Sequence, residues 1–435
     1  MSVDKQPFRA SLAAFIGTMV EWYDYYIYGT AAALVFGTLF FPGHSHFIST
    51  IASFATFAVG FFARPLGAAI FGHIGDRIGR KKSLMVTLVM MGVSTFCIGL
   101  LPTYSSWGVV APVMLILLRI IQGIAVGGEW GGAVLMAGEH APKGKQNFFA
   151  SFAQWGSPAG LILSILAFSL VSRLDESAFL DWGWRLPFLA SSVMLLVGFL
   201  IRVGVKESPE FQEIKNTNQL SENPVKDAWR FSGGLIMLAV GANALGIAGG
   251  YFTNTFMLTY GIQYLGLQRS VILDCIFVVA IVQFISQPVG AWIAMKIGVR
   301  KFLITSSLIT IFLPYPMFML VDTGSTTYIT LGISLAMIGL CTFYSVIAGY
   351  VASIFPARYR YTGISMAYQI SGALLGGLTP IIGSVLAEKF SGHWWPLALF
   401  FSLISLCSLL SVVVMGRRVT AHAQRYNSQT EVKSF

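Results

Sequence analysis

The sequence predicts an all-α membrane protein with twelve transmembrane helices arranged as two six-helix halves. The 435-residue chain is 55% hydrophobic and only 11% charged, whereas soluble globular proteins carry about 25% charged residues. Its apolar runs are far longer than the roughly ten-residue alternating strands of a membrane barrel. Because every backbone group in the hydrocarbon layer must be bonded internally, these runs can only be helices.

Twelve apolar runs between polar breaks are long enough to cross a bilayer, which takes about 20 residues. They cover residues 9–38, 48–72, 83–102, 108–138, 147–172, 184–204, 231–260, 270–294, 302–321, 326–350, 360–387 and 394–415. With a cytoplasmic N-terminus, 22 of the 28 Lys and Arg residues fall in cytoplasmic segments. This asymmetry follows the positive-inside rule and predicts that both termini are cytoplasmic. Topology therefore explains the net charge of +10, and we expect no nucleic-acid binding.

The one long polar connection divides the chain between its sixth and seventh runs. We predict an N-terminal half over 1–205, a cytoplasmic linker with a short surface helix over 206–230, a C-terminal half over 231–418 and a cytoplasmic tail over 419–435. A shift of 214 residues aligns Pro142 with Pro356 and Ser157 with Ser371. Such repeated halves are common in transporters, where the substrate lies between them near the membrane midplane.

The loop after the second run has glycines and an aspartate that topology alone does not require. It runs from Gly72 to Lys82 as GHIGDRIGRKK, and it resembles the signature loop of the major facilitator superfamily. That resemblance implies a conformational latch, with Glu139 at the end of the fourth run as its partner. The residues that we assign to the latch are Gly72, Gly75, Asp76, Arg77, Gly79, Arg80, Lys81 and Glu139.

Further motifs are similar to the metabolite:proton symporter family within that superfamily. They are Glu21–Asp24 (EWYD), Arg64–Gly67 (RPLG), Arg119–Gly123 (RIIQG), Gly127–Gly132 (GGEWGG), Trp182–Phe188 (WGWRLPF), Glu207–Phe211 (ESPEF) and Arg358–Gly363 (RYRYTG). The resemblance covers nearly the whole chain. It implies a multi-pass protein of the bacterial inner membrane that works as a monomer in the lipid bilayer.

Five charged side chains lie inside apolar runs of the first half: Glu21, Asp24, Arg64, Arg119 and Glu129. Charges at such positions are costly and usually functional. A carboxylate beside a guanidinium can act as a proton switch, because the cation favours the ionised form. We predict that Asp24 is the main proton carrier and is paired with Arg119, with Glu21 and Glu129 as rivals. The alternative for each charge is a structural ion pair between helices.

The second half offers polar side chains but almost no charge within its runs. Most such residues in helix bundles serve as interhelical hydrogen-bonding groups. Those that also suit hydroxyl or carbonyl groups on a solute are Asn243, Asn254, Gln283, Gln287, Tyr344, Tyr368 and Gln369. The expected substrate-binding set is Arg64, Arg119, Gln122, Trp130, Tyr28, Asn243, Asn254, Tyr344, Tyr368 and Gln369. For the tyrosines of the first run, helix packing is the competing interpretation.

Two intramembrane arginines favour a carboxylate substrate, because a guanidinium binds that group through two hydrogen bonds. We therefore expect a symporter that imports a small organic anion by alternating access and is driven by the proton gradient without any cofactor. The resemblance implies shikimate or a similar hydroxy- or oxo-carboxylate. A proline or betaine transporter is the alternative, and a non-transporting sensor a distant one. The sequence has no metal cluster, nucleotide loop or nucleophile paired with a base, so we expect no enzyme.

Overall fold

Helices make up all the regular secondary structure of residues 6–43 and 46–432, the part of the chain that this computed structural model describes. In the first half they are α1 (Gln6–Ala31), a π-helical turn η1 (Ala32–Phe36), α2 (Gly37–Phe40), α3 (His46–Arg77), α4 (Arg80–Leu100), α5 (Tyr104–Trp107), α6 (Val110–Glu139), α7 (Gln146–Val171), α8 (Glu176–Ala178), a π-helical turn η2 (Phe179–Gly183) and α9 (Arg185–Val203). The short helix α10 (Pro209–Asn216) follows, where the sequence predicts a surface helix.

The second half repeats this pattern of long helices with short interruptions. Its elements are α11 (Pro224–Tyr251), a π-helical turn η3 (Phe252–Phe256), α12 (Met257–Gln263), α13 (Arg269–Ile297), α14 (Val299–Phe312), α15 (Pro314–Val321), α16 (Thr326–Ile354), a 3₁₀ turn η4 (Ala357–Tyr359), α17 (Arg360–Ser371), a π-helical turn η5 (Gly372–Gly376), α18 (Thr379–Lys389) and α19 (Trp395–Val432).

Ten helical stretches among the described residues are long and apolar enough to cross a membrane. The other two predicted runs correspond to the stretches 6–40 and 360–389, which are helical but more polar and are broken by η1 and η5. Residues 361–369 of α17 are all buried within the protein. A helix that is surrounded by other helices need not be apolar on every side, which explains why these two runs are weaker in hydropathy than the rest.

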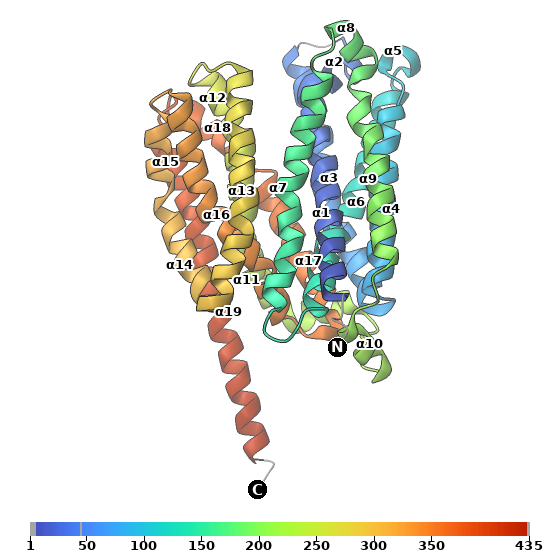
Figure 1. The fold of residues 1–435 in the computed structure, drawn as a ribbon, viewed down its shortest axis with the longest axis vertical. Coiled ribbons are helices and arrows are strands. Elements are labelled where there is room, and N and C mark those ends of the chain that lie inside the picture. The colour runs from blue at the N-terminus through green and yellow to red at the C-terminus, as the bar shows by residue number, and fades with distance from the viewer. Residues whose placement is uncertain (1–5, 44–45, 433–435) are drawn as a thin grey trace.

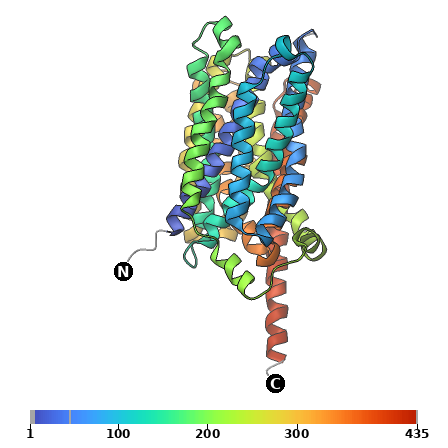
Figure 2. The ribbon, with the colours of Figure 1, turned by 90° about the vertical axis from the view of Figure 1, so that its right-hand side faces the viewer.

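The helices form two bundles that stand side by side. Helices α1 to α9 build one bundle and α11 to α19 the other, with α7 and α17 between them in Figure 1. The contacts across the boundary come from α3, α6 and α7 on one side and from α11, α13, α16 and α17 on the other. Helix α10 and the described ends of α1 and α19 lie at one end of both bundles (Figures 1 and 2). We call this end the α10 face and the opposite end the far face.

Glycines let α3 and α6 approach to backbone contact. A Cβ atom at Gly67 would overlap the backbone of Ile124, and one at Gly123 or Gly127 would overlap the carbonyl oxygen of Gly60 or Arg64. Small residues of this kind are how membrane helices pack closely when water provides no driving force between them. This contact fixes the position of the two helices that carry Arg64 and Arg119.

Candidate functional site

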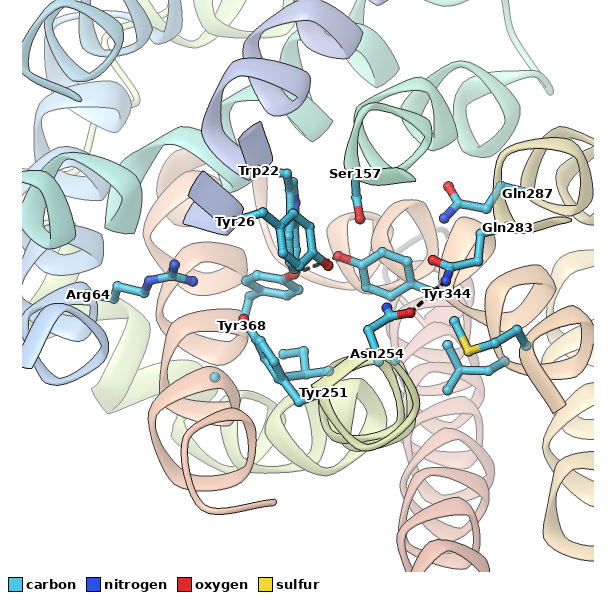
Figure 3. Close-up of a pocket in the computed structure, with 16 residues that line it drawn as sticks. Trp22, Tyr26, Arg64, Ser157, Tyr251, Asn254, Gln283, Gln287, Tyr344 and Tyr368 are labelled. Atoms are coloured by element: carbon cyan, nitrogen blue, oxygen red, sulfur yellow. Dashed lines mark hydrogen bonds between the residues drawn. The ribbon is translucent and has the colours of Figure 1, made fainter. Parts of the chain in front are cut away.

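A cavity lies between the two bundles and encloses about 520 Å³ of empty space, the open space at its mouth included. The first half contributes Trp22, Tyr26, Arg64 and Ser157, and the second half contributes the remaining polar and aromatic lining. Figure 3 shows Arg64 at one end of this cavity and the amides of Gln283 and Gln287 at the other. The cavity therefore has one cationic end and one neutral, hydrogen-bonding end.

Arg64 is the charged group of this cavity. Its side chain is 6% exposed, and its guanidinium lies 5.1 Å from the ring centroid of Tyr25 and 4.4 Å from that of Phe61. Among the described residues, no hydrogen bond or salt bridge to this guanidinium is found. Glu21 interacts with Arg64 electrostatically but forms no salt bridge with it. A buried cation that forms no ion pair is costly, so Arg64 can bind an anion that enters the cavity.

The neutral wall comes from helices of the second half. Gln283 on α13 donates to the side-chain oxygen of Asn254, which lies in the π-helical turn η3, at 2.9 Å. Tyr344 on α16 and Tyr368 on α17 share a hydrogen bond of 2.6 Å between their hydroxyl groups. These amides and phenols can donate to and accept from hydroxyl or carbonyl groups of a ligand.

Aromatic and amide contacts between the two halves lie on the α10 side of this cavity. The ring of Trp130 on α6 stacks on Tyr368 with centroids 3.6 Å apart. Trp130 also donates to Gln154 at 2.5 Å, and Gln154 donates in turn to the backbone oxygen of Tyr344 at 3.0 Å. Two of the residues that line the cavity, Tyr344 and Tyr368, are therefore tied directly to the first half.

Asp24 is completely buried and is not in direct contact with Arg119. Its two carboxylate oxygens accept hydrogen bonds from Thr95 at 2.6 Å and from Ser191 at 2.7 Å. Arg119 instead donates to Gln122 at 2.6 Å and lies over the ring of Tyr28 at 4.1 Å. The predicted pair of Asp24 and Arg119 is therefore corrected to an indirect link. The Thr95 hydroxyl on α4 and the Gln122 amide on α6 lie between the two charges.

Glu21 faces a second, smaller cavity within the first half. This space is lined by Glu21, Tyr25, Gly60, Arg64, Arg119, Gln122, Gly123 and Val126. One carboxylate oxygen of Glu21, Oε2, is buried and has no hydrogen-bond partner. Arg64 lines both cavities, and Tyr25 lines the smaller one.

Glu129 forms a buried ion pair with Arg202, which lies near the end of the run 184–204 but was not among the five charges singled out from the sequence. Both nitrogens of the guanidinium fork bond Glu129, and the Nη1–Oε2 distance is 3.1 Å. Thr87 donates to the same carboxylate at 2.7 Å. Both oxygens of Glu129 are therefore occupied, which corresponds to the structural ion pair left open in the sequence analysis.

The signature loop joins the halves at the α10 face. Asp76 at the end of α3 accepts hydrogen bonds from the backbone nitrogens of Tyr361 and Thr362 and from the Thr362 hydroxyl, at 2.9–3.2 Å. These nitrogens belong to the first turn of α17, where free N–H groups favour an anion. Gly75 leaves room for the Tyr361 ring, and the Tyr361 hydroxyl donates to the backbone oxygen of Gly128 at 2.6 Å.

A second group of charges surrounds Glu139 at the same face. Arg80 lies 3.3 Å from Glu139 and 3.5 Å from Asp76, and it also donates to the backbone oxygen of Ala357 at 3.2 Å. Arg360 approaches Glu139 at 3.4 Å and bonds Glu210 of α10. The predicted partner Glu139 thus lies beside Arg80 of the loop. Arg77 is exposed, and Lys81 donates to the backbone oxygen of Val203 at 2.7 Å.

The predicted substrate-binding residues divide into three groups. Arg64, Asn254, Tyr344 and Tyr368 line the main cavity, while Arg119 and Gln122 line the smaller one. The other four lie outside both linings: Tyr28 bonds Thr56, Trp130 bonds Gln154, Asn243 bonds its own helix at Ala239, and Gln369 bonds the backbone of Val126. Helical phase explains this division, since only residues three or four positions apart share a helix face and the positions between them point to other neighbours.

The expected set omitted most of the cavity lining, including the polar residues Ser157, Gln283 and Gln287 and three aromatic residues. Trp22, Tyr26 and Tyr251 form an aromatic group in which the ring centroids of Trp22 and Tyr26 are 5.5 Å apart and those of Trp22 and Tyr251 are 6.4 Å apart. A signal existed for the first two, because Trp22 and Tyr26 are four residues apart and so share one helix face. For Tyr251 the sequence offers no comparable signal.

Comparisons with known proteins agree over nearly the whole chain. Residues 10–234 match the family model described as "Sugar (and other) transporter", and residues 239–434 match "Major Facilitator Superfamily". The chain is 40% identical over 411 residues to the shikimate transporter of Escherichia coli, covering 94% of each chain. It is 34% identical to the glycine betaine/proline/ectoine/pipecolic acid transporter OusA of Dickeya dadantii, covering 94% of this chain and 83% of that one.

Solved structures show the same architecture at low sequence identity. The proton:xylose symporter XylE superposes with a TM-score of 0.76 at 16% identity, covering 95% of this chain and 96% of the other. The fucose:proton symporter FucP of E. coli gives a TM-score of 0.68 at 12% identity, covering 93% and 98%. These superpositions confirm the predicted twelve-helix fold.

Proposed function

The chain belongs to the major facilitator superfamily of membrane transporters, and we propose that it is a proton-coupled symporter that imports a small organic carboxylate. As expected from the sequence, its relatives are transporters and not enzymes. We place it in a bacterial inner membrane as a monomer, with both termini and the α10 face toward the cytoplasm. The proton gradient drives it without a cofactor.

One observation carries this proposal: the Arg64 guanidinium lines a cavity between the halves and forms no hydrogen bond or salt bridge with a counter-ion among the described residues. A carboxylate would supply that counter-ion through two parallel hydrogen bonds. Charge-assisted hydrogen bonds are worth about 1.5–3 kcal/mol each. The anionic end of the substrate therefore binds to the first half.

The opposite end of the cavity fits hydroxyl or oxo groups. Asn254, Gln283 and Gln287 present amides, and Tyr344 and Tyr368 present phenols, all without charge. Hydroxyl groups satisfy such donors and acceptors, and a bare apolar group would leave them unpaired. This supports a hydroxy- or oxo-carboxylate, and the 40% identity to a shikimate transporter supports shikimate as the first compound to test.

Asp24 is the proposed proton carrier. It is buried, it lies on the helix next to both cavities, and its oxygens are held by hydroxyl groups that can serve either protonation state. Glu129 is excluded from this role in the proposal, because Arg202 and Thr87 occupy its carboxylate. Glu21 remains the rival, since its oxygen Oε2 has no partner.

A second candidate function is supported by the aromatic group of Trp22, Tyr26 and Tyr251. Aromatic faces bind quaternary ammonium groups, and Arg64 would bind the carboxylate of a betaine equally well. The relative OusA carries this class of compound in its name. The absence of any charged group on the other described residues that line the cavity fits both classes, so direct uptake must decide between them.

The test is uptake of labelled compounds into proteoliposomes with an inward proton gradient. The panel contains shikimate, a second hydroxymonocarboxylate, 2-oxoglutarate, succinate, proline and glycine betaine. We expect accumulation of a hydroxy- or oxo-carboxylate that collapses when the gradient is dissipated. Accumulation of glycine betaine or proline alone would favour the second candidate, and accumulation of none would contradict the symporter.

Arg64→Lys tests the binding role of the fork. Lysine keeps the charge and loses the paired geometry, so we expect the KM for the transported compound to rise about ten-fold or more, which corresponds to the loss of one charge-assisted hydrogen bond. The matched control is Arg173→Lys, at an exposed loop residue, which should leave KM unchanged. An unchanged KM in Arg64→Lys would contradict the proposed carboxylate site.

A further inference from the structure

We propose that Thr95 and Gln122 act as positioning residues that couple Arg119 to Asp24 through a directional hydrogen-bond relay. In this relay the Thr95 hydroxyl turns between two acceptors as Asp24 gains and loses its proton. The inference rests on the proposed symport function and adds the path by which the cation of α6 and the carboxylate of α1 influence each other.

The relay consists of three consecutive hydrogen bonds among buried side chains. Arg119 donates to the Gln122 oxygen at 2.6 Å, the Gln122 nitrogen donates to the Thr95 hydroxyl oxygen at 2.8 Å, and the Thr95 hydroxyl donates to Asp24 at 2.6 Å. Arg119, Gln122, Thr95 and Asp24 are each 3% exposed or less. The chain of bonds thus runs without interruption from a buried cation on α6, through α4, to a buried carboxylate on α1.

All three bonds point in the same direction, from the cation to the anion. Aligned hydrogen bonds of this kind polarise and strengthen one another, and the low dielectric of the interior increases the effect. The Gln122 amide can hold only one orientation here, since its oxygen must accept from Arg119 and its nitrogen must donate to Thr95. Gln122 and Thr95 therefore transmit the charge of Arg119 to Asp24 although the two ions do not touch.

Thr95 has a second acceptor within reach. Its hydroxyl oxygen also lies 3.0 Å from the backbone oxygen of Met91, one turn earlier on α4. A hydroxyl group has a single proton to donate and two lone pairs to accept with. Thr95 can therefore donate either to Asp24 or to Met91, and it keeps the Gln122 bond in both cases.

The two orientations match the two protonation states of Asp24. When Asp24 is ionised, Thr95 and Ser191 both donate to it. When Asp24 takes up one proton, its new O–H needs an acceptor, and the Thr95 oxygen supplies one after the hydroxyl turns to Met91. One proton enters at Asp24 and one leaves it in each cycle, while Thr95 keeps its own, so no further proton donor or acceptor is needed.

Few other charged groups act on Asp24. Arg119 on α6 is the cation that faces it, and Glu21 and Tyr23 on its own helix interact with it electrostatically. Glu21 in turn interacts electrostatically with Arg64, Glu129 and Arg202. From α4 and α9, the groups that contact Asp24 are the hydroxyls of Thr95 and Ser191. The relay is thus the direct bonded connection between the proposed proton site and a cation.

The relay also has a connection to the substrate cavity. Arg119 and Gln122 line the smaller cavity, and Arg64 lines both the smaller and the main cavity. A carboxylate that binds Arg64 changes the electrostatic surroundings of Arg119. Through the relay this change reaches the hydrogen bonds of Asp24, which links substrate binding to proton binding.

The test compares proton-driven accumulation with substrate exchange in the same proteoliposomes. Thr95→Val replaces the hydroxyl by a methyl group of similar shape. We expect accumulation to fall at least ten-fold while exchange of internal for external substrate continues. Thr95→Val removes one hydrogen-bond donor from the ionised form of Asp24, so Asp24 should keep its proton to a higher pH. The pH at which exchange falls to half, as the pH is raised, should therefore move upward by about one to two units.

Two matched variants separate the relay from structural damage. Thr95→Ser keeps the hydroxyl and should restore accumulation and the wild-type pH profile. Ser94→Ala removes a neighbouring buried hydroxyl that, among the described residues, bonds only the backbone of Met90, and it should change neither. If Thr95→Val keeps the wild-type pH profile, or if Thr95→Ser behaves like Thr95→Val, the relay is not used.

Gln122→Leu breaks the relay at its other joint. Residues that act as one unit show non-additive effects, so the double variant of Thr95→Val and Gln122→Leu should lose no more accumulation than the more affected single variant. Independent, multiplying losses would contradict the relay. Failure of the proposed function is distinguishable, because the wild-type protein itself would then show no accumulation under a proton gradient.

Discussion

Glu129 illustrates at the residue scale how much a single buried charge depends on its neighbours. The sequence shows a carboxylate inside an apolar run and leaves proton transfer and a structural ion pair both open. The deciding partner, Arg202, lies in the last turn of α9, where a long side chain could equally reach water. The sequence did offer one signal that Arg202 points inward: it is four residues after the small residue Gly198 and so shares its helix face, which is buried in the structure.

Removing one member of this pair should destabilise the protein strongly. Glu129→Gln leaves the Arg202 guanidinium buried without a counter-ion, and breaking a buried pair in this way costs about 3–5 kcal/mol. We expect a clear fall in the melting temperature of the detergent-solubilised protein. A double variant with Glu129→Gln and Arg202→Met removes both charges and should recover most of the loss.

The control for this prediction is Glu213→Gln, at an exposed carboxylate on α10. It should change the free energy of unfolding by no more than about half a kcal/mol and so leave the melting temperature nearly unchanged. If Glu129→Gln is as stable as the wild type and instead abolishes proton-driven accumulation, Glu129 carries the proton and the structural interpretation fails.

Arg64 and Asn243 show which residues of the cavity lining could be predicted from the sequence and which could not. Both are polar groups inside apolar runs, yet Arg64 lines the cavity while Asn243 donates to the backbone of Ala239 on its own helix. A charged residue within an apolar run is visible in the sequence and is a candidate functional residue. The sequence does not determine how a 28-residue helix such as α11 is rotated about its own axis, because that rotation is set by packing against neighbours far along the chain.

At the scale of elements, the first turn of α17 docks onto the end of α3. The signature loop predicted a latch and the aspartate in it, and Asp76 does bond a helix end. The identity of that helix could not be predicted, because α17 follows Asp76 by more than 280 residues and nothing in the loop specifies a long-range partner. Tyr361, which fills the space at Gly75, was missed for the same reason.

Asp76→Asn should weaken this contact and favour the state that is open at the α10 face. The carboxylate accepts three hydrogen bonds from α17 and lies beside Arg80. Loss of its charge should shift the conformational equilibrium by about 2 kcal/mol, or about 30-fold. Spin labels at the exposed positions Lys143 and Ser353, with the four native cysteines replaced, would measure the increased separation.

The same pair of labels in the Glu213→Gln background is the control, because Glu213 lies at this face but outside the contact. Equal label distances in wild type, Asp76→Asn and Glu213→Gln would show that the Asp76 contact does not hold the halves together.

At the scale of the whole molecule, the two halves differ in chemistry while they share a fold. Glu21, Asp24, Arg64, Arg119 and the Glu129–Arg202 pair all lie in the first half. The second half faces the cavity with amides, phenols and the apolar side chains of Met337 and Leu340. Ion and carboxylate chemistry is therefore concentrated in one bundle, and the other bundle contributes the hydroxyl-recognising wall.

This division was predictable because charges inside apolar runs are visible in a sequence. The closed contacts at the α10 face were not, since they depend on which of two alternating conformations the bundles adopt. The hydrogen bonds of Gln154 and Gln369 to backbone oxygens in the opposite half exist only while the halves are joined there. Opening this face must break them, together with the Trp130–Tyr368 stack.

The most direct measurement is proton-driven accumulation and substrate exchange by Asp24→Asn beside the wild type, in the same proteoliposomes and with the same labelled carboxylate. Asparagine resembles the protonated aspartate in shape and cannot release a proton. We predict that accumulation disappears while exchange continues and no longer depends on pH. Wild-type accumulation by Asp24→Asn would contradict this prediction and would move the proton site to Glu21.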